Sequence, residues 1–224
     1  MEEYIPIFRI ILMITETLAA IVAFCYWRKL RDSYWKYFPF YLTWIATAEW
    51  LGLLSLKNNW GADFNRVLYN FFVSPSEYLF FLWLIGNFIK TQTKYSHISL
   101  FFSGIYLLLL LAENTFFSTE THFFLSLSNS IATMFLLILQ LFYLYNFIFS
   151  DEILHYRTSI EFWVIIGITF YYLISFPFYG TWNVLMNKHY NIFVVYYPIV
   201  MMLSTLMYIC FIVGIIWGKP KPKS

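Results

Sequence analysis

The sequence has few charged residues, which make up 12% of its 224 positions. A soluble domain carries about 25%. Two cysteines, Cys25 and Cys210, are too few for a disulfide scaffold and are expected to be small packing residues. The net charge is only +2 and no basic run stands in a polar domain, which excludes nucleic acid as a partner. Instead, 61% of the residues are hydrophobic and 24% are aromatic, a composition that belongs in a bilayer.

Apolar stretches fill most of the chain. A spanning helix needs about 20 mostly apolar residues, and the stretches lack the alternation of barrel strands. The sequence therefore predicts an all-α polytopic membrane protein, with residues 1–224 forming a single seven-helix transmembrane bundle. The predicted helices are 5–27, 37–56, 67–89, 98–116, 122–149, 160–180 and 191–217.

Positive charge is distributed unequally between the two sets of predicted loops. Cytoplasmic loops hold the excess of lysine and arginine, so this asymmetry predicts an outside N-terminus and a cytoplasmic C-terminus. The set with fewer holds three, namely Lys57, Arg66 and Lys188. The richer set holds ten: Arg28, Lys29, Arg31, Lys36, Lys90, Lys94, Arg157, Lys219, Lys221 and Lys223.

Several ionisable residues lie deep within the predicted spans, where a charge costs about 2.5–3.5 kcal/mol on insertion scales. At about 1.5 Å per residue, Glu16 and Glu77 lie near the midplane, roughly 15 Å from the outer ends of their helices. Glu49 lies in the outer half, and Arg9 lies one to two turns below the outer surface. Glu113, close to the outer surface, is expected to face water.

The helical phase of these residues predicts a shared polar pocket. Arg9 and Glu16 are seven residues apart and share a face, and Asn70, Ser74 and Glu77 form a single stripe. Prolines within three spans (Pro75, Pro177 and Pro198) are expected to kink them and to favour an internal cavity. The predicted ligand-binding residues, all facing the outer half, are Arg9, Glu16, Glu49, Asn70, Glu77 and Asn129.

Four buried carboxylates against one arginine leave three interpretations open. The unpaired acids are protonated, or a cation or amine ligand completes the site, or the glutamates are interhelical struts. Arg9 is expected to pair with Glu16 or with Glu49.

Signatures of catalysis and of metal or cofactor binding are missing. The four histidines form no His-x-x-x-His pair, and neither Gly-x-Ser-x-Gly nor a phosphate-binding glycine loop occurs. The predicted last helix has no lysine for a retinal Schiff base. No catalytic residue, metal site or cofactor is predicted, and an enzyme is the less favoured interpretation.

The segment at 161–172 has the sequence Glu-Phe-Trp-Val-Ile-Ile-Gly-Ile-Thr-Phe-Tyr-Tyr. Its Phe-Trp, Gly and Phe-Tyr pattern resembles small uncharacterised seven-helix membrane proteins of Bacteroidota, some of them similar to membrane sensory modules of histidine kinases. The resemblance covers about twelve residues and the general layout. It implies a bacterial inner-membrane protein that receives a signal and passes it to a partner kinase, and it supplies no binding residues.

The favoured hypothesis is a sensory, receptor-like protein that binds a small molecule or lipid in the outer pocket and signals through a cytoplasmic partner. The alternative is a proton- or cation-coupled transporter that uses Glu16 and Glu77 at the midplane. A lipid-directed membrane enzyme and a structural subunit are further alternatives.

Overall fold

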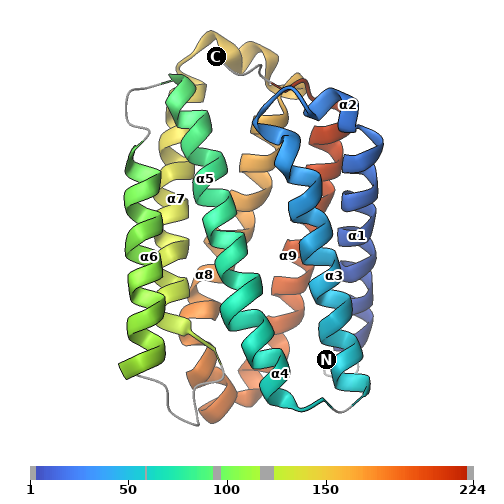
Figure 1. Cartoon of the computed structure of the whole chain (residues 1–224), viewed down its shortest axis with the longest axis vertical. Coiled ribbons are helices and arrows are strands. Elements are labelled where there is room, and N and C mark those ends of the chain that lie inside the picture. Colours follow the sequence, from blue (N-terminus) through green and yellow to red (C-terminus); the bar gives the residue numbers. More distant parts are fainter. Residues whose placement is uncertain (1–3, 59, 93–96, 117–123, 221–224) are drawn as a thin grey trace.

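The computed structural model describes residues 4–58, 60–92, 97–116 and 124–220 as a bundle of long helices (Figure 1). Six of the helices in these ranges are long and apolar enough to cross a membrane, which indicates an integral membrane protein. The helix Phe38–Lys57, the second predicted span, has 20 residues but is not among the six. Lys94, His122, Lys221 and Lys223 lie outside the described residues.

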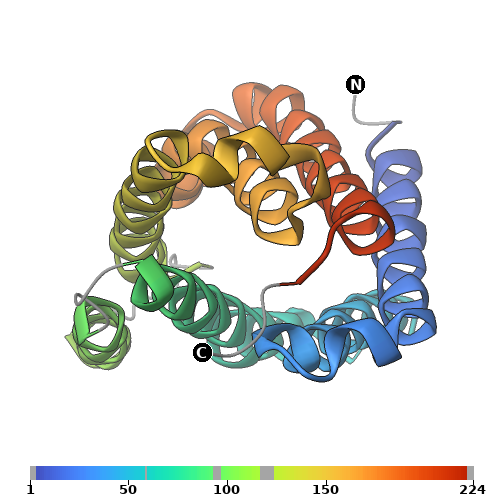
Figure 2. The ribbon, with the colours of Figure 1, turned by 90° about the horizontal axis from the view of Figure 1, so that it is seen from above.

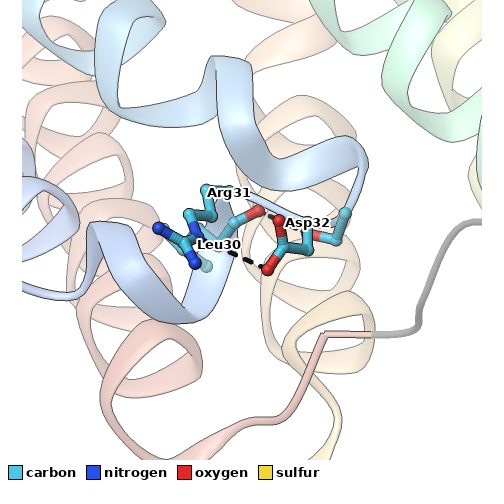
Figure 3. A network of polar contacts seen from close by, with 4 residues as sticks. Leu30, Arg31 and Asp32 are labelled. Atoms are coloured by element: carbon cyan, nitrogen blue, oxygen red, sulfur yellow. Dashed lines mark hydrogen bonds and ion pairs between the residues drawn. The ribbon is translucent and has the colours of Figure 1, made fainter.

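The first helices begin at prolines. Helix α1 covers Ile5–Cys25 and α3 covers Phe38–Lys57, and each has proline in its first turn, where the missing N–H costs nothing. Short helices α2 (Trp27–Leu30) and η2 (Tyr34–Tyr37) connect them. Within this connection the Ser33 hydroxyl donates to the Leu30 carbonyl, and Arg31 pairs with the exposed Asp32 (Figure 3).

The next helix contains a π-helical segment. Helix α4 (Ala62–Val67) leads into η3 (Leu68–Val73), a π-helix, and then into α5 (Ser74–Gln92). Such π-segments occur frequently at functional sites. Pro75 is the second residue of α5, so its missing N–H group falls next to this irregular turn. Helix α6 covers His97–Phe116.

The remaining helices are α7 (Ser126–Ile148), η4 (Asp151–Thr158), α8 (Ile160–Lys188) and α9 (Tyr190–Trp217). The predicted end of a helix at residue 180 is wrong, because α8 continues to Lys188 and only His189 separates it from α9. Gly180 lies against the Ser130 hydroxyl, so this glycine permits close packing of α8 on α7 and does not end the helix. Pro177 and Pro198 lie inside α8 and α9, as predicted.

Six helices form a ring, and α6 lies outside it (Figure 2). Around the ring, α3 packs on α1, α1 on α9, α9 on α8, α8 on α7 and α7 on α5, and η3 returns to α3. Helix α6 packs against α5 and α7 only from outside. The two ends of the bundle are named as follows (Figure 1). The N-terminal end is the one at which α1 begins, and it also holds α4 and the turn between α8 and α9. The C-terminal end is the opposite one, which holds α2 and η4.

Small residues bring the ring helices close together. A Cβ atom on Gly167 would lie 2.9 Å from Cβ of Cys210, so the contact of α8 with α9 depends on this glycine. Ala19 and Ala23 are completely buried on α1. These small residues let neighbouring helices pack closely within the bundle. Both cysteines are free.

An aromatic layer fills the ring between its middle and the C-terminal end. It consists of Phe38 and Tyr41 on α3, Phe80 and Phe81 on α5, and Phe211 on α9. The ring centroids of Phe38 and Phe211 are 5.3 Å apart, and those of Tyr41 and Phe81 are 5.2 Å apart. Phe38, Phe81 and Phe211 are fully buried, so this layer belongs to the packed core of the bundle.

Candidate functional site: a polar cavity inside the ring

A cavity of about 550 Å³ occupies the half of the ring that faces the N-terminal end. Helices α1, α3, α5, α8 and α9 and the η3 segment contribute its walls. Its volume lies in the usual range for small-molecule sites. The polar and aromatic lining residues are Arg9, Glu16, Glu49, Asn65, Arg66, Tyr69, Asn70, Ser74, Glu77, Tyr78, Phe124, Tyr171, Tyr172, Tyr179, Trp182, Tyr197, Ser204 and Tyr208.

Two helical stripes predicted from the sequence face this cavity. Arg9 and Glu16 line it from α1, and Asn70, Ser74 and Glu77 line it from η3 and α5. The stripe of Asn70, Ser74 and Glu77 stays on the cavity face although the π-helical turn lies within it. Five of the six predicted ligand-binding residues thus meet in one space, with Glu49 of α3 as the fifth.

A tyrosine from another element lies beside each cavity glutamate. The Tyr172 hydroxyl of α8 donates to Oε1 of Glu77 on α5 at 2.7 Å. Tyr69 of η3 is a polar neighbour of Glu49 on α3, and Tyr208 of α9 is a polar neighbour of Glu16 on α1. The bond from Tyr172 holds the Glu77 carboxylate at a fixed place on the cavity wall.

Glu16 keeps one oxygen without a partner. Its side chain is only 3% exposed, and Oε2 has no hydrogen-bond partner in the protein. Buried polar atoms nearly always have one. Because Glu16 lines the cavity, this oxygen can accept a hydrogen bond from a molecule inside it.

Arg9 acts on the glutamates through space. Among the described residues, the ion pairs closer than 4 Å are Arg31 with Asp32 and Arg66 with Asp63. Arg9 is the main electrostatic partner of Glu49, whereas its attraction is the weakest of the effects on Glu16. Of the two partners predicted for Arg9, the structure favours Glu49.

Asn129 lies elsewhere. It is 1% exposed on α7, outside the cavity lining, and its Oδ1 accepts a hydrogen bond of 3.2 Å from Tyr106 of α6. Asn129 lies in the first turn of α7, and its side chain faces the junction with the outer helix α6. The sequence does not reveal this orientation, because it depends on α6 lying outside the ring.

Glu113 does not face water, so that prediction is wrong. It is 6% exposed, and its two oxygens accept hydrogen bonds from the backbone N–H groups of Leu127 and Ser128 at 3.0 and 2.6 Å. These groups belong to the first turn of α7, whose N–H groups lack helical partners. Glu113 therefore caps α7 and belongs to the scaffold.

The cavity reaches the surface at the N-terminal end. Arg66, whose side chain is 41% exposed, lies in its lining and pairs with Asp63 at 3.2 Å. Phe124 and Trp182 flank this region with ring centroids 5.3 Å apart. Asn183 holds the chain at Phe124 by bonds to both its N–H and its carbonyl, at 3.3 and 2.8 Å.

The tyrosines are the residues that the sequence interpretation missed. Seven of them line the cavity, and none is among the six predicted ligand-binding residues. No sequence period separates them from the many other aromatic residues, because their common feature is a position beside a glutamate of another helix. Among the described residues, no group of three His, Cys, Asp or Glu side chains is placed to hold a metal ion.

Comparison with protein-family models, with curated proteins and with solved structures finds no match to this chain.

Proposed function

We propose that this chain is a sensory, receptor-like protein of a bacterial inner membrane, with seven spanning helices. Its N-terminal end faces outside, and its cavity binds a small molecule or lipid from that side. The observation that carries the proposal is the 550 Å³ cavity, in which residues of α1, α3, α5, α8 and α9 converge around three carboxylates. A site on several helices can alter their packing when it is occupied.

Charge supports the orientation. Arg28, Arg31, Arg157 and Lys219 lie at the C-terminal end and are exposed. Positive residues of this kind favour the cytoplasmic side. Among the described residues the N-terminal end holds Lys57, Arg66 and Lys188.

The aromatic layer favours a receptor over the alternative of a proton- or cation-coupled transporter. Phe81 and Phe211 of this layer are fully buried with ring centroids 6.2 Å apart, and such apolar packing does not favour passage of a proton or cation. Gln140 is buried on α7 outside the cavity lining, and neither amide atom has a partner.

A continuous set of packed side chains joins the cavity to the opposite end. Tyr172, which bonds Glu77, contacts Phe81 at 6.4 Å between centroids, and Phe81 contacts Phe211. Phe211 packs on Phe38 at 5.3 Å and Phe38 on Trp35 at 5.1 Å. The Trp35 indole donates to Oε1 of Glu161 at 3.0 Å. This contact joins η2 to the start of α8, where a cytoplasmic partner, such as a kinase, would detect the change.

Native mass spectrometry of the full chain, released gently from its own membranes, tests the proposal. We expect a co-purifying small molecule or lipid on the unmodified chain, and its loss in Arg9→Ala and in Glu77→Gln. Both variants should keep the helical circular dichroism spectrum. Equal occupancy in all three proteins, or proton flux into vesicles reporting with a pH dye, would contradict a receptor cavity.

A further inference from the structure

The charge in the cavity is unbalanced, and the imbalance is local. The charge of Arg9 acts most strongly on Glu49, and Arg66 at the cavity mouth pairs with Asp63. Glu16 and Glu77 are left without a cation of their own, although Glu16 interacts electrostatically with both other cavity glutamates. Carboxylates close together in a buried site repel one another unless a proton or a cation intervenes.

The geometry at Glu16 adds a second, independent observation. Glu16 lines the cavity beside Tyr208, its side chain is 3% exposed, and its Oε2 has no hydrogen-bond partner in the protein. A carboxylate oxygen accepts hydrogen bonds and cannot donate them when ionised. For an ionised Glu16 the missing partner is a donor, and an ammonium group supplies donors and positive charge together.

The remaining lining fits the rest of such a ligand. Seven tyrosines and Trp182 surround the carboxylates, and their ring faces attract cations. A bare metal ion fits poorly, because among the described residues no three metal-ligating side chains converge. A volume of about 550 Å³ accommodates an organic molecule with an apolar part.

We infer that the cavity selects an organic cation, an amine protonated at neutral pH that carries an aromatic or alkyl group, with its ammonium between Glu16 and Glu77. This inference rests on the proposed function and specifies its ligand class. The ammonium donates to Oε2 of Glu16, and its apolar part lies against the tyrosine rings. The bond from Tyr172 keeps the Glu77 carboxylate in place before binding.

Three probes of one shape and different charge test this assignment. Isothermal titration of the full chain in a nonionic detergent compares 2-phenylethylamine with the neutral 2-phenylethanol and the anionic phenylacetate. We expect the amine to bind at least about tenfold more tightly than either analogue. Glu16→Gln should weaken amine binding by about tenfold or more, because the amide replaces one acceptor oxygen with a donor.

Asp151→Asn is the matched control, since it removes a carboxylate from the exposed first turn of η4 at the C-terminal end. It should leave amine affinity unchanged, and the melting temperature of each variant checks its fold. Equal binding of the amine to the unmodified chain and to a folded Glu16→Gln would overturn the assignment, as would binding of none of the probes. Preferential binding of phenylacetate would also overturn it, while the cavity would stand as the ligand site of the proposed receptor.

Discussion

The Tyr172 hydroxyl donates a hydrogen bond of 2.7 Å to Oε1 of Glu77, and it joins two helices, α8 and α5, that α7 separates around the ring. The bond therefore crosses the interior of the bundle. In this position it fixes a carboxylate on the cavity wall and connects that wall to Phe81 of the aromatic layer. The cavity wall and the helix packing share this residue.

Removing this bond should destabilise the bundle. Tyr172→Phe leaves Glu77 with one donor fewer in a buried place, and the loss should cost about 1–3 kcal/mol. The measurement is unfolding in mixed micelles with increasing SDS. Tyr145→Phe on the exposed face of α7 is the control and should change stability little. Equal stability of Tyr172→Phe and Tyr145→Phe would show that the bond contributes nothing to packing.

The glycine at position 52 should be needed for the Tyr69–Glu49 pair. A Cβ atom there would lie 2.7 Å from the Tyr69 hydroxyl oxygen, so Gly52→Ala should displace this ring from the cavity wall. Overpacking of this kind costs about 1–3 kcal/mol.

Gly104→Ala is the comparison for Gly52→Ala. It lies inside α6 with nothing within 4 Å of the new Cβ, so it should stabilise the protein by about 0.5–1 kcal/mol. Thermal unfolding of both variants checks the two opposite signs. A stable Gly52→Ala would mean that Tyr69 moves freely.

The cap on α7 should appear in local exchange. Glu113→Ala removes both acceptors from the N–H groups of Leu127 and Ser128, and the loss should cost about 1–2 kcal/mol, as for other N-terminal caps. Hydrogen exchange measured by mass spectrometry should rise in the first turn of α7. Thr115→Ala, on the exposed side of α6, should leave that exchange unchanged. Unchanged exchange in Glu113→Ala would contradict the capping role.

The contact between Trp35 and Glu161 should show energetic coupling. A double-mutant cycle with Trp35→Phe and Glu161→Gln isolates the bond of 3.0 Å from the other losses of each change. We expect a coupling of about 1–3 kcal/mol, as for a hydrogen bond to a charged group. Strictly additive effects would remove this contact from the set of side chains that joins the cavity to the C-terminal end.

Length and periodicity predicted the long helices well, because a continuous apolar stretch leaves no other way to satisfy the backbone in lipid. Helical phase also placed Arg9 with Glu16, and Asn70 with Glu77, on faces that line the cavity. Phase within one helix does not determine which helix lies opposite. For that reason the partners Tyr69, Tyr172 and Tyr208 were not predicted.

The errors have the same origin. Asn129 was assigned to the pocket because its depth was suitable, yet α6 outside the ring takes that face of α7. Glu113 was expected in water because it lies near a helix end, but the next helix begins there and supplies two N–H groups. Gly180 was interpreted as a helix end, although it is a contact with Ser130.

Cysteine labelling in right-side-out membrane vesicles tests most directly whether the acidic cavity opens to the outside. Cys25 and Cys210 are first replaced by alanine, and single cysteines are then introduced as Ser74→Cys and Ser204→Cys in the cavity lining, Ser175→Cys in the buried packing, and Thr158→Cys at the C-terminal end. A charged, membrane-impermeant thiosulfonate added outside should modify the two cavity positions and neither of the others. Modification of Thr158→Cys from outside, or protection of both cavity positions, would contradict the account.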